Sequence, residues 1–78
     1  MKVTNIGSNM TEIRCGGYTI LVSYETPVAA FDSNGFYKTS KYHSNTTSKH
    51  INKWLDGVEG VQERPQEFFD NLLEGQNG

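Results

Sequence analysis

Short runs of strand-forming residues, separated by turn residues, fill the chain from residue 2 to residue 42. In the strongest run, residues 18–24, apolar side chains occur at both odd and even positions, so we expect this strand to lie in the middle of a sheet. Two turns, Gly16-Gly17 and Asn34-Gly35, are typical of tight hairpins because glycine readily adopts positive φ. Thr26-Pro27 interrupts the pattern, since proline cannot donate a hydrogen bond to a neighbouring strand. The other strand candidates are residues 2–6, 10–15, 28–32 and 36–40.

The second half of the chain changes to helical spacing. Residues 46–57 follow polar residues that can cap a helix, and residues 64–74 begin near Pro65, which a first turn tolerates. Each segment has one apolar stripe, as a helix that covers a sheet requires. This order predicts one α+β domain, residues 1–78, with an antiparallel meander of four or five strands in residues 1–42 and both helices packed on one face. The expected core is Ile20, Val22, Phe31, Ile51, Trp54, Leu55, Phe68, Phe69, Leu72 and Leu73.

The small size of the chain restricts what it can contain. A chain of 78 residues leaves little room for an active-site cleft beside a core. Cys15 is the only cysteine, which excludes an internal disulfide, and with His43 and His50 it is an incomplete ligand set for zinc. We therefore expect no metal and no cofactor, and a monomer or homodimer. The sequence has no long apolar segment and no signal-peptide core, which predicts a cytoplasmic protein that does not enter a membrane.

Charge is unevenly distributed, although the net charge is only −2. Residues 33–55 carry four lysines and no acid, whereas residues 56–78 carry six acids and one arginine. Lysines interleaved with aromatic residues are suited to phosphates and stacked bases, but an acidic protein surface also fits them, and so does an ordinary solvated surface. Two alternative sets of partner-binding residues follow: a basic set of Tyr37, Lys38, Lys41, Tyr42, Lys49 and Lys53, and an acidic set of Glu63, Glu67, Asp70 and Glu74.

The sequence contains no recognisable catalytic motif. It lacks both glycine-rich phosphate-binding patterns. Cys15 could pair with a histidine as a nucleophile, but its place at the end of a strand favours a small packed thiol. His50, at the boundary of an apolar helix stripe, favours hydrogen-bonded packing. These observations predict a protein that is not an enzyme.

Three further blocks of sequence are distinctive: KVTNIGSN at residues 2–9, YETPVAAF at residues 24–31 and TTSKHINKWL at residues 46–55. These blocks resemble a family of small uncharacterised proteins from bacteriophages and mobile elements. The resemblance covers residues 2–56 and leaves out the acidic C-terminal helix. It implies no activity and no site residue, but small non-catalytic phage proteins often act by occluding a host protein, including host-defence complexes such as CRISPR effectors.

The residues and the resemblance together predict a non-enzymatic accessory protein of a phage or mobile element. We expect it to bind a host or viral protein in the host cytoplasm. The more specific expectation is that it inhibits a host defence, as an anti-CRISPR protein does. The alternative is a small nucleic-acid-binding protein that uses the basic and aromatic residues 36–53. That alternative requires the acidic helix to leave the lysines uncovered.

Overall fold

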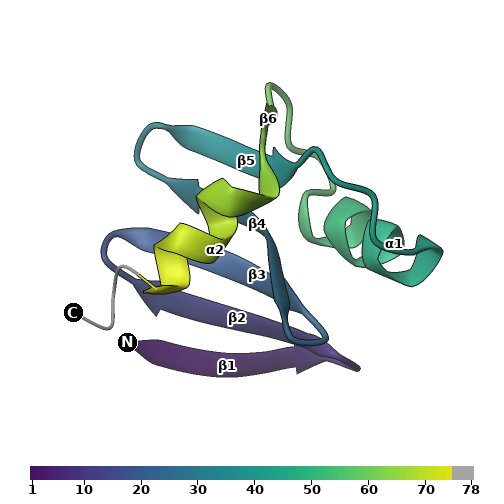
Figure 1. The fold of residues 1–78 in the computed structure, drawn as a ribbon, viewed down its shortest axis with the longest axis horizontal. Helices are drawn as coiled ribbons and strands as arrows, with labels where there is room; N and C mark the ends of the chain where they lie inside the picture. The colour runs from purple at the N-terminus through teal and green to yellow at the C-terminus, as the bar shows by residue number, and fades with distance from the viewer. Residues whose placement is uncertain (75–78) are drawn as a thin grey trace.

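In a computed structural model, which describes residues 1–74, six strands form one sheet in the order in which they occur in the chain (Figure 1). Strands β1 to β5 pair antiparallel, and β6 pairs parallel to β5. The α+β class is therefore confirmed. The elements are β1 Lys2–Gly7, β2 Met10–Cys15, β3 Tyr18–Ser23, β4 Thr26–Asp32, β5 Gly35–Thr39, α1 Asn45–Trp54, β6 Gln62–Arg64 and α2 Gln66–Glu74.

Tight turns join the first five strands, as the sequence predicted. Gly16 and Gly17 have φ values of 57° and 83°, which glycine adopts without steric cost. At the turn between β4 and β5, the Asp32 carboxylate accepts hydrogen bonds from the backbone N–H groups of Asn34 and Gly35, at 2.9 and 3.2 Å. Pro27 lies inside β4 and does not precede it, because the register of the β3–β4 pair shifts there and tolerates the missing donor.

The sixth strand was not expected from the sequence. Its residues, Gln62–Arg64, lie beside Tyr37, Lys38 and Thr39 of β5. Three polar residues show neither the length nor the alternation of a strand, so the sequence pattern indicated only a connector. They become a strand because α1 returns the chain to the open edge of β5, as a parallel pair requires. The sheet is thus mixed, with six strands instead of four or five.

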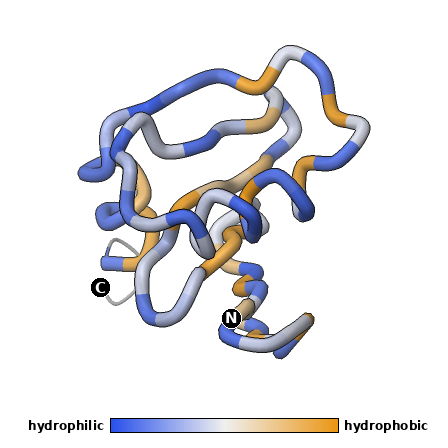
Figure 2. The backbone as a smooth tube through the Cα atoms, turned by 90° about the vertical axis from the view of Figure 1, so that its right-hand side faces the viewer, coloured by the Kyte–Doolittle hydropathy of each residue, from blue (hydrophilic) through white to orange (hydrophobic). Residues whose placement is uncertain are grey.

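The two helices pack on opposite faces of the sheet, so the expectation of one covered face was wrong. Leu21 of β3 packs with Ile51 of α1, whereas its neighbour Ile20 packs with Phe69 of α2. Consecutive side chains of a strand point to opposite faces of the sheet. Because β3 carries apolar side chains on both faces, a helix must cover each face to bury them. Figure 1 shows α2 crossing in front of the strands and α1 displaced to one side. In Figure 2, hydrophobic positions concentrate in the middle of the molecule and hydrophilic positions dominate the peripheral loops.

Helix α2 is fixed to the sheet at its first residue and at its centre. Gln66 accepts a hydrogen bond from the Thr39 hydroxyl at 2.9 Å and donates one to the Pro27 carbonyl at 2.7 Å. Phe69 has no exposed surface. Side chains of α2 and of four strands, β2 to β5, then form the core on this face, which contains Cys15, Ile20, Val22, Ala30, Tyr37 and Phe69.

The core on the other face also differs from expectation. Phe31 and Trp54 are only half-buried, although both were expected among the core residues, and so are Phe68, Leu72 and Leu73 on the α2 face. Helix α1 ends at Trp54 and is capped at Leu55, three residues before the expected end, and Gly57 follows with a φ of 79°. The buried residues here are Met10, Leu21, Val28, Ala29, Ile51 and Leu55.

Candidate functional site

Polar contacts as well as apolar packing attach α1 to the sheet. The buried Ser23 hydroxyl lies 3.0 Å from Thr47 Oγ1 and 2.7 Å from His50 Nδ1. A serine and a histidine at such a distance can form a nucleophile–base pair, but Ser23 is only 2% exposed and cannot meet a substrate. The contact positions α1, and it confirms the hydrogen-bonded packing predicted for His50.

The solvent side of α1 carries Lys49 and Lys53, and an exposed tyrosine lies on each side of the helix. Tyr24 is 51% exposed, and its ring centroid is 5.9 Å from that of His50. Tyr42 is 67% exposed, and its hydroxyl donates a hydrogen bond to Asn45 Oδ1 at 2.8 Å. The exposed residues Tyr24, Tyr42, Lys49 and Lys53 are called the α1 surface below.

Tyr24 occupies an unfavourable backbone conformation. The sequence pattern placed it at the end of a strand, but β3 ends at Ser23 and Tyr24 has a φ of 58°. Its N–H donates to the carbonyl of Asn9, at 2.8 Å, and Asn9 also has a positive φ of 59°. A left-handed conformation costs a residue with a side chain roughly 1–2 kcal/mol. The fold therefore holds an exposed aromatic ring at this turn against a conformational cost.

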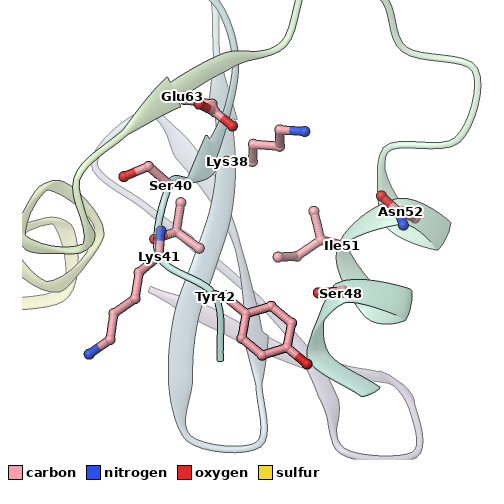
Figure 3. Close-up of a pocket in the computed structure, with 9 residues that line it drawn as sticks. Lys38, Ser40, Lys41, Tyr42, Ser48, Ile51, Asn52 and Glu63 are labelled. Carbon is pink, nitrogen blue, oxygen red and sulfur yellow. Dashed lines mark hydrogen bonds between the residues drawn. The ribbon is translucent and has the colours of Figure 1, made fainter. Parts of the chain in front are cut away.

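A polar hollow of about 170 Å³ lies between the end of β5, the loop after it and α1 (Figure 3). Lys38 and Tyr42 point toward α1, while the Lys41 side chain extends away from the helix. Glu63 of β6 is the strand partner of Lys38 and also lines the hollow. One member of the acidic set thus lies beside one member of the basic set, and the two charges offset each other here.

The structure divides the basic set between the two faces of the sheet. Tyr42, Lys49 and Lys53 are exposed on the side of α1, whereas Lys41 is exposed but its side chain extends away from the helix. Tyr37 is on the α2 face and is 7% exposed, so it cannot join them. Burial, together with a 3.1 Å hydrogen bond that its hydroxyl donates to Asp32, raises the pKa of Tyr37 above its ordinary value.

The acidic set lies mainly on α2. Glu67, Asp70 and Glu74 are exposed along this helix, and Glu63 is on β6. Because α1 and α2 pack on opposite faces, α2 does not cover Lys49 or Lys53.

The side chains that could support catalysis or metal binding are separated. Cys15 is buried on the α2 face, His50 contacts Ser23 on the α1 face, and the His43 ring lies 2.9 Å from Gln66 Oε1. Cys15 therefore does not pair with either histidine, and it is the small packed thiol that the sequence favoured. Among residues 1–74, no group of three or more His, Cys, Asp or Glu side chains could hold a metal ion. In the same part of the chain, no helix is both long and apolar enough to cross a membrane.

Comparison with known proteins identifies a family. A family model described as "Family of unknown function (DUF8033)" matches residues 1–71. This range extends beyond residues 2–56, to which the resemblance was assigned, and includes the first two-thirds of α2. The description of the family does not mention phages or mobile elements. No curated protein and no solved structure matches the chain.

Proposed function

The chain belongs to DUF8033, a family of unknown function, and we propose from its geometry that it is a non-catalytic binding protein. It contacts an acidic surface of a partner protein through the α1 surface. The observation that carries this proposal is that two tyrosines, 51% and 67% exposed, flank a helix whose solvent side carries Lys49 and Lys53. Tyrosine is enriched at the centres of protein interfaces, and lysine at a rim steers association with an acidic partner.

The conformation of Tyr24 supports the same proposal. Residues held in unfavourable backbone regions cluster at functional sites, where a fold tolerates the cost. Asparagine or glycine would adopt a φ of 58° more easily than tyrosine. A binding role for the exposed ring explains why tyrosine occupies this turn.

The resemblance noted above suggests the biological context of this proposal. In a bacteriophage or mobile element, a small binding protein of this kind would act on a host or viral protein, including a host-defence complex. The charge of the α1 surface restricts the partner further, to a protein with an acidic contact region.

The test of this function begins with the wild-type protein as bait in a host lysate, followed by calorimetry with the recovered protein. We expect Tyr24→Ala with Tyr42→Ala, and separately Lys49→Glu with Lys53→Glu, to weaken binding at least tenfold, as for interface anchors and paired charges. The matched control is Glu67→Lys with Asp70→Lys on α2. If the α2 variant loses binding and the α1 variants keep it, the acidic set makes the contact and the proposal fails.

A second candidate, binding to single-stranded nucleic acid, is favoured by the position of α2. The acidic helix is on the opposite face, which is the arrangement that this alternative required. The test is fluorescence anisotropy of labelled DNA and RNA at about 50 and 200 mM salt, since binding to several phosphates weakens by orders of magnitude between them. Lys49→Glu with Lys53→Glu should abolish the binding and its salt dependence. Absence of binding at low salt removes this candidate.

A further inference from the structure

Exposed apolar side chains are concentrated at one edge of the sheet. Met1, Val3 and Ile6 are 74%, 61% and 39% exposed, and the other large exposed hydrophobic residues are the two tyrosines of the α1 surface. Val3 and Ile6 belong to β1, which is an edge strand. The outer N–H and C=O groups of an edge strand are a template for pairing with another strand.

The two edges of the sheet differ in how they are protected. β6 is three residues long, includes Glu63 and Arg64, and is followed by Pro65, all of which discourage further pairing. β1 is six residues long, and Lys2 is its only charged residue. Its irregularity lies between Asn5 and Gly7, which leaves a regular segment before it. β1 is therefore the open edge.

Val3 ends a row of side chains that crosses the α2 face. The strand registers align Val3 with Ile13, Ile13 with Ile20, Ile20 with Ala30, and Ala30 with Tyr37. The row is buried from Tyr37 to Ile20, half-buried at Ile13 and exposed at Val3. The apolar core thus continues to the edge of the sheet and stops at an uncovered valine.

We propose that β1 pairs antiparallel with β1 of a second copy of this chain, about a two-fold axis at Val3. The pairing joins two six-stranded sheets into one and places Val3 against Val3 of the partner subunit. The apolar row then runs without interruption from one core to the other. Because the interface is two-fold symmetric, it closes at the dimer and does not form a fibre.

Charge complementarity favours a second copy of this chain as the partner of β1, and it favours the register with the axis at Val3. With the axis at Val3, Lys2 lies opposite Thr4 of the partner subunit, and within one chain Thr4 pairs with Glu12. Lys2 and Glu12 of the partner subunit then lie in the same row of side chains on the α1 face. Their Cα atoms are two strand spacings apart, about 9–10 Å, and their side chains are long enough to meet across that distance. An axis at Thr4 would instead place Lys2 opposite Ile6 and Val3 opposite Asn5, and both favourable contacts would be lost.

The expected dimer is weak. A single strand edge gives an interface at the low end of the range for specific complexes, so we expect a dissociation constant on the order of micromolar or weaker. The proposal is independent of the proposed function, because β1 lies outside the α1 surface.

Sedimentation equilibrium from low micromolar to near-millimolar concentration tests the association. The mass should rise from 8.8 kDa toward twice that value. Val3→Lys places like charges directly opposite each other, and we expect it to raise the dissociation constant about tenfold or more. Gln62→Lys, which adds the same charge to the β6 edge, should leave the dissociation constant unchanged. A monomer at every concentration, or a dimer that Val3→Lys does not weaken, overturns the proposal.

Cysteine cross-linking tests the register independently of any charge effect. In a Cys15→Ala background, Val3→Cys should form a disulfide-linked dimer, since directly opposed residues of an antiparallel pair lie within the roughly 4.4–6.8 Å Cα range of a disulfide. Asn5→Cys, which faces the same side of the strand but is not opposite itself, should cross-link at least tenfold more slowly. Equal rates at the two positions would rule out the register at Val3.

Discussion

The indole N–H of Trp54 donates a hydrogen bond to Glu12 Oε2, at 3.0 Å, and so connects the last residue of α1 to β2. The same ring lies against Phe31 in a tilted aromatic contact, with centroids 5.8 Å apart and ring planes at 34°. The half-buried Trp54 thus contributes one directed hydrogen bond and one aromatic contact, and it is not the fully enclosed core residue that the sequence suggested.

Substitutions at Trp54 should separate these two contributions. Trp54→Phe keeps an aromatic contact with Phe31 and loses the hydrogen bond, so we expect a loss of about 1–2 kcal/mol in the free energy of unfolding. Trp54→Ala loses both contributions and should cost about 3 kcal/mol, the lower end of the range for large aromatics because the ring is half-buried. Urea denaturation measures both values. Equal losses for the two variants would show that the aromatic contact with Phe31 contributes nothing.

Ser23 should be more important for stability than its size suggests. Its hydroxyl serves both Thr47 and His50, and it is buried, so Ser23→Ala removes a buried hydrogen-bond centre and should cost about 1–3 kcal/mol. Ser33→Ala, at an exposed turn position, is the matched control and should stay within about 0.5 kcal/mol of the wild type. Thermal denaturation of the two variants gives the comparison. A loss for Ser23→Ala no larger than for the control would contradict the structural role assigned to this contact.

Tyr24 is expected to lower the free energy of unfolding and to strengthen binding to the partner protein. Tyr24→Asn relieves the left-handed backbone and should stabilise the fold by up to about 1 kcal/mol, reduced by the lost contact with His50. The same variant should bind the partner less well, since the exposed ring is gone. Denaturation and binding assays on one preparation test both effects. A variant that is less stable than the wild type would show that Tyr24 is a packing residue and that its conformation carries no functional cost.

The raised pKa of Tyr37 predicts a loss of stability at alkaline pH. Burial and the hydrogen bond to Asp32 favour the neutral hydroxyl in the folded state. The stabilisation is complete below the unfolded pKa of about 10 and is lost as the pH rises through the higher folded pKa. Urea midpoints on both sides of that range should fall more for the wild type than for Tyr37→Phe, which cannot ionise. Asp32→Asn removes the nearby charge but not the burial of Tyr37, so its urea midpoint should fall by an intermediate amount. An identical dependence of the urea midpoint on pH in all three proteins would contradict the assignment to Tyr37.

Local patterns predicted the elements of this fold better than their arrangement. Alternation in residues 18–24 correctly indicated a central strand, and Gly16-Gly17 and Asn34-Gly35 correctly indicated two of the hairpins, because both signals depend on a few adjacent residues. The same alternation contained the evidence for two covered faces, since Ile20 and Leu21 cannot share one cover. The strand at Gln62–Arg64 left no such signal, because only the neighbouring β5 makes these residues a strand.

The candidate site shows the same limit. The single apolar stripe of residues 46–57 correctly indicated that α1 has an exposed side. Tyr37 and Tyr42, however, are close in sequence and lie in different environments, which only the strand register of Tyr37 decides. Tyr24 was missed as a surface residue because its type fits a strand, and its positive φ arises from the turn that follows β3.

The parallel pairing of β5 with β6 has a consequence for the order in which the chain folds. β1 to β5 are joined by hairpins, whose contacts are local and form on a timescale of about 1–10 μs. β6 can pair only after α1 has reversed the direction of the chain, so its contacts carry a larger loop-closure entropy. We expect the segment from β6 onward to join last and to open first in native-state hydrogen exchange. When it opens, α2 leaves with it, and the apolar row that ends at Tyr37 becomes accessible at the end of the sheet farthest from β1.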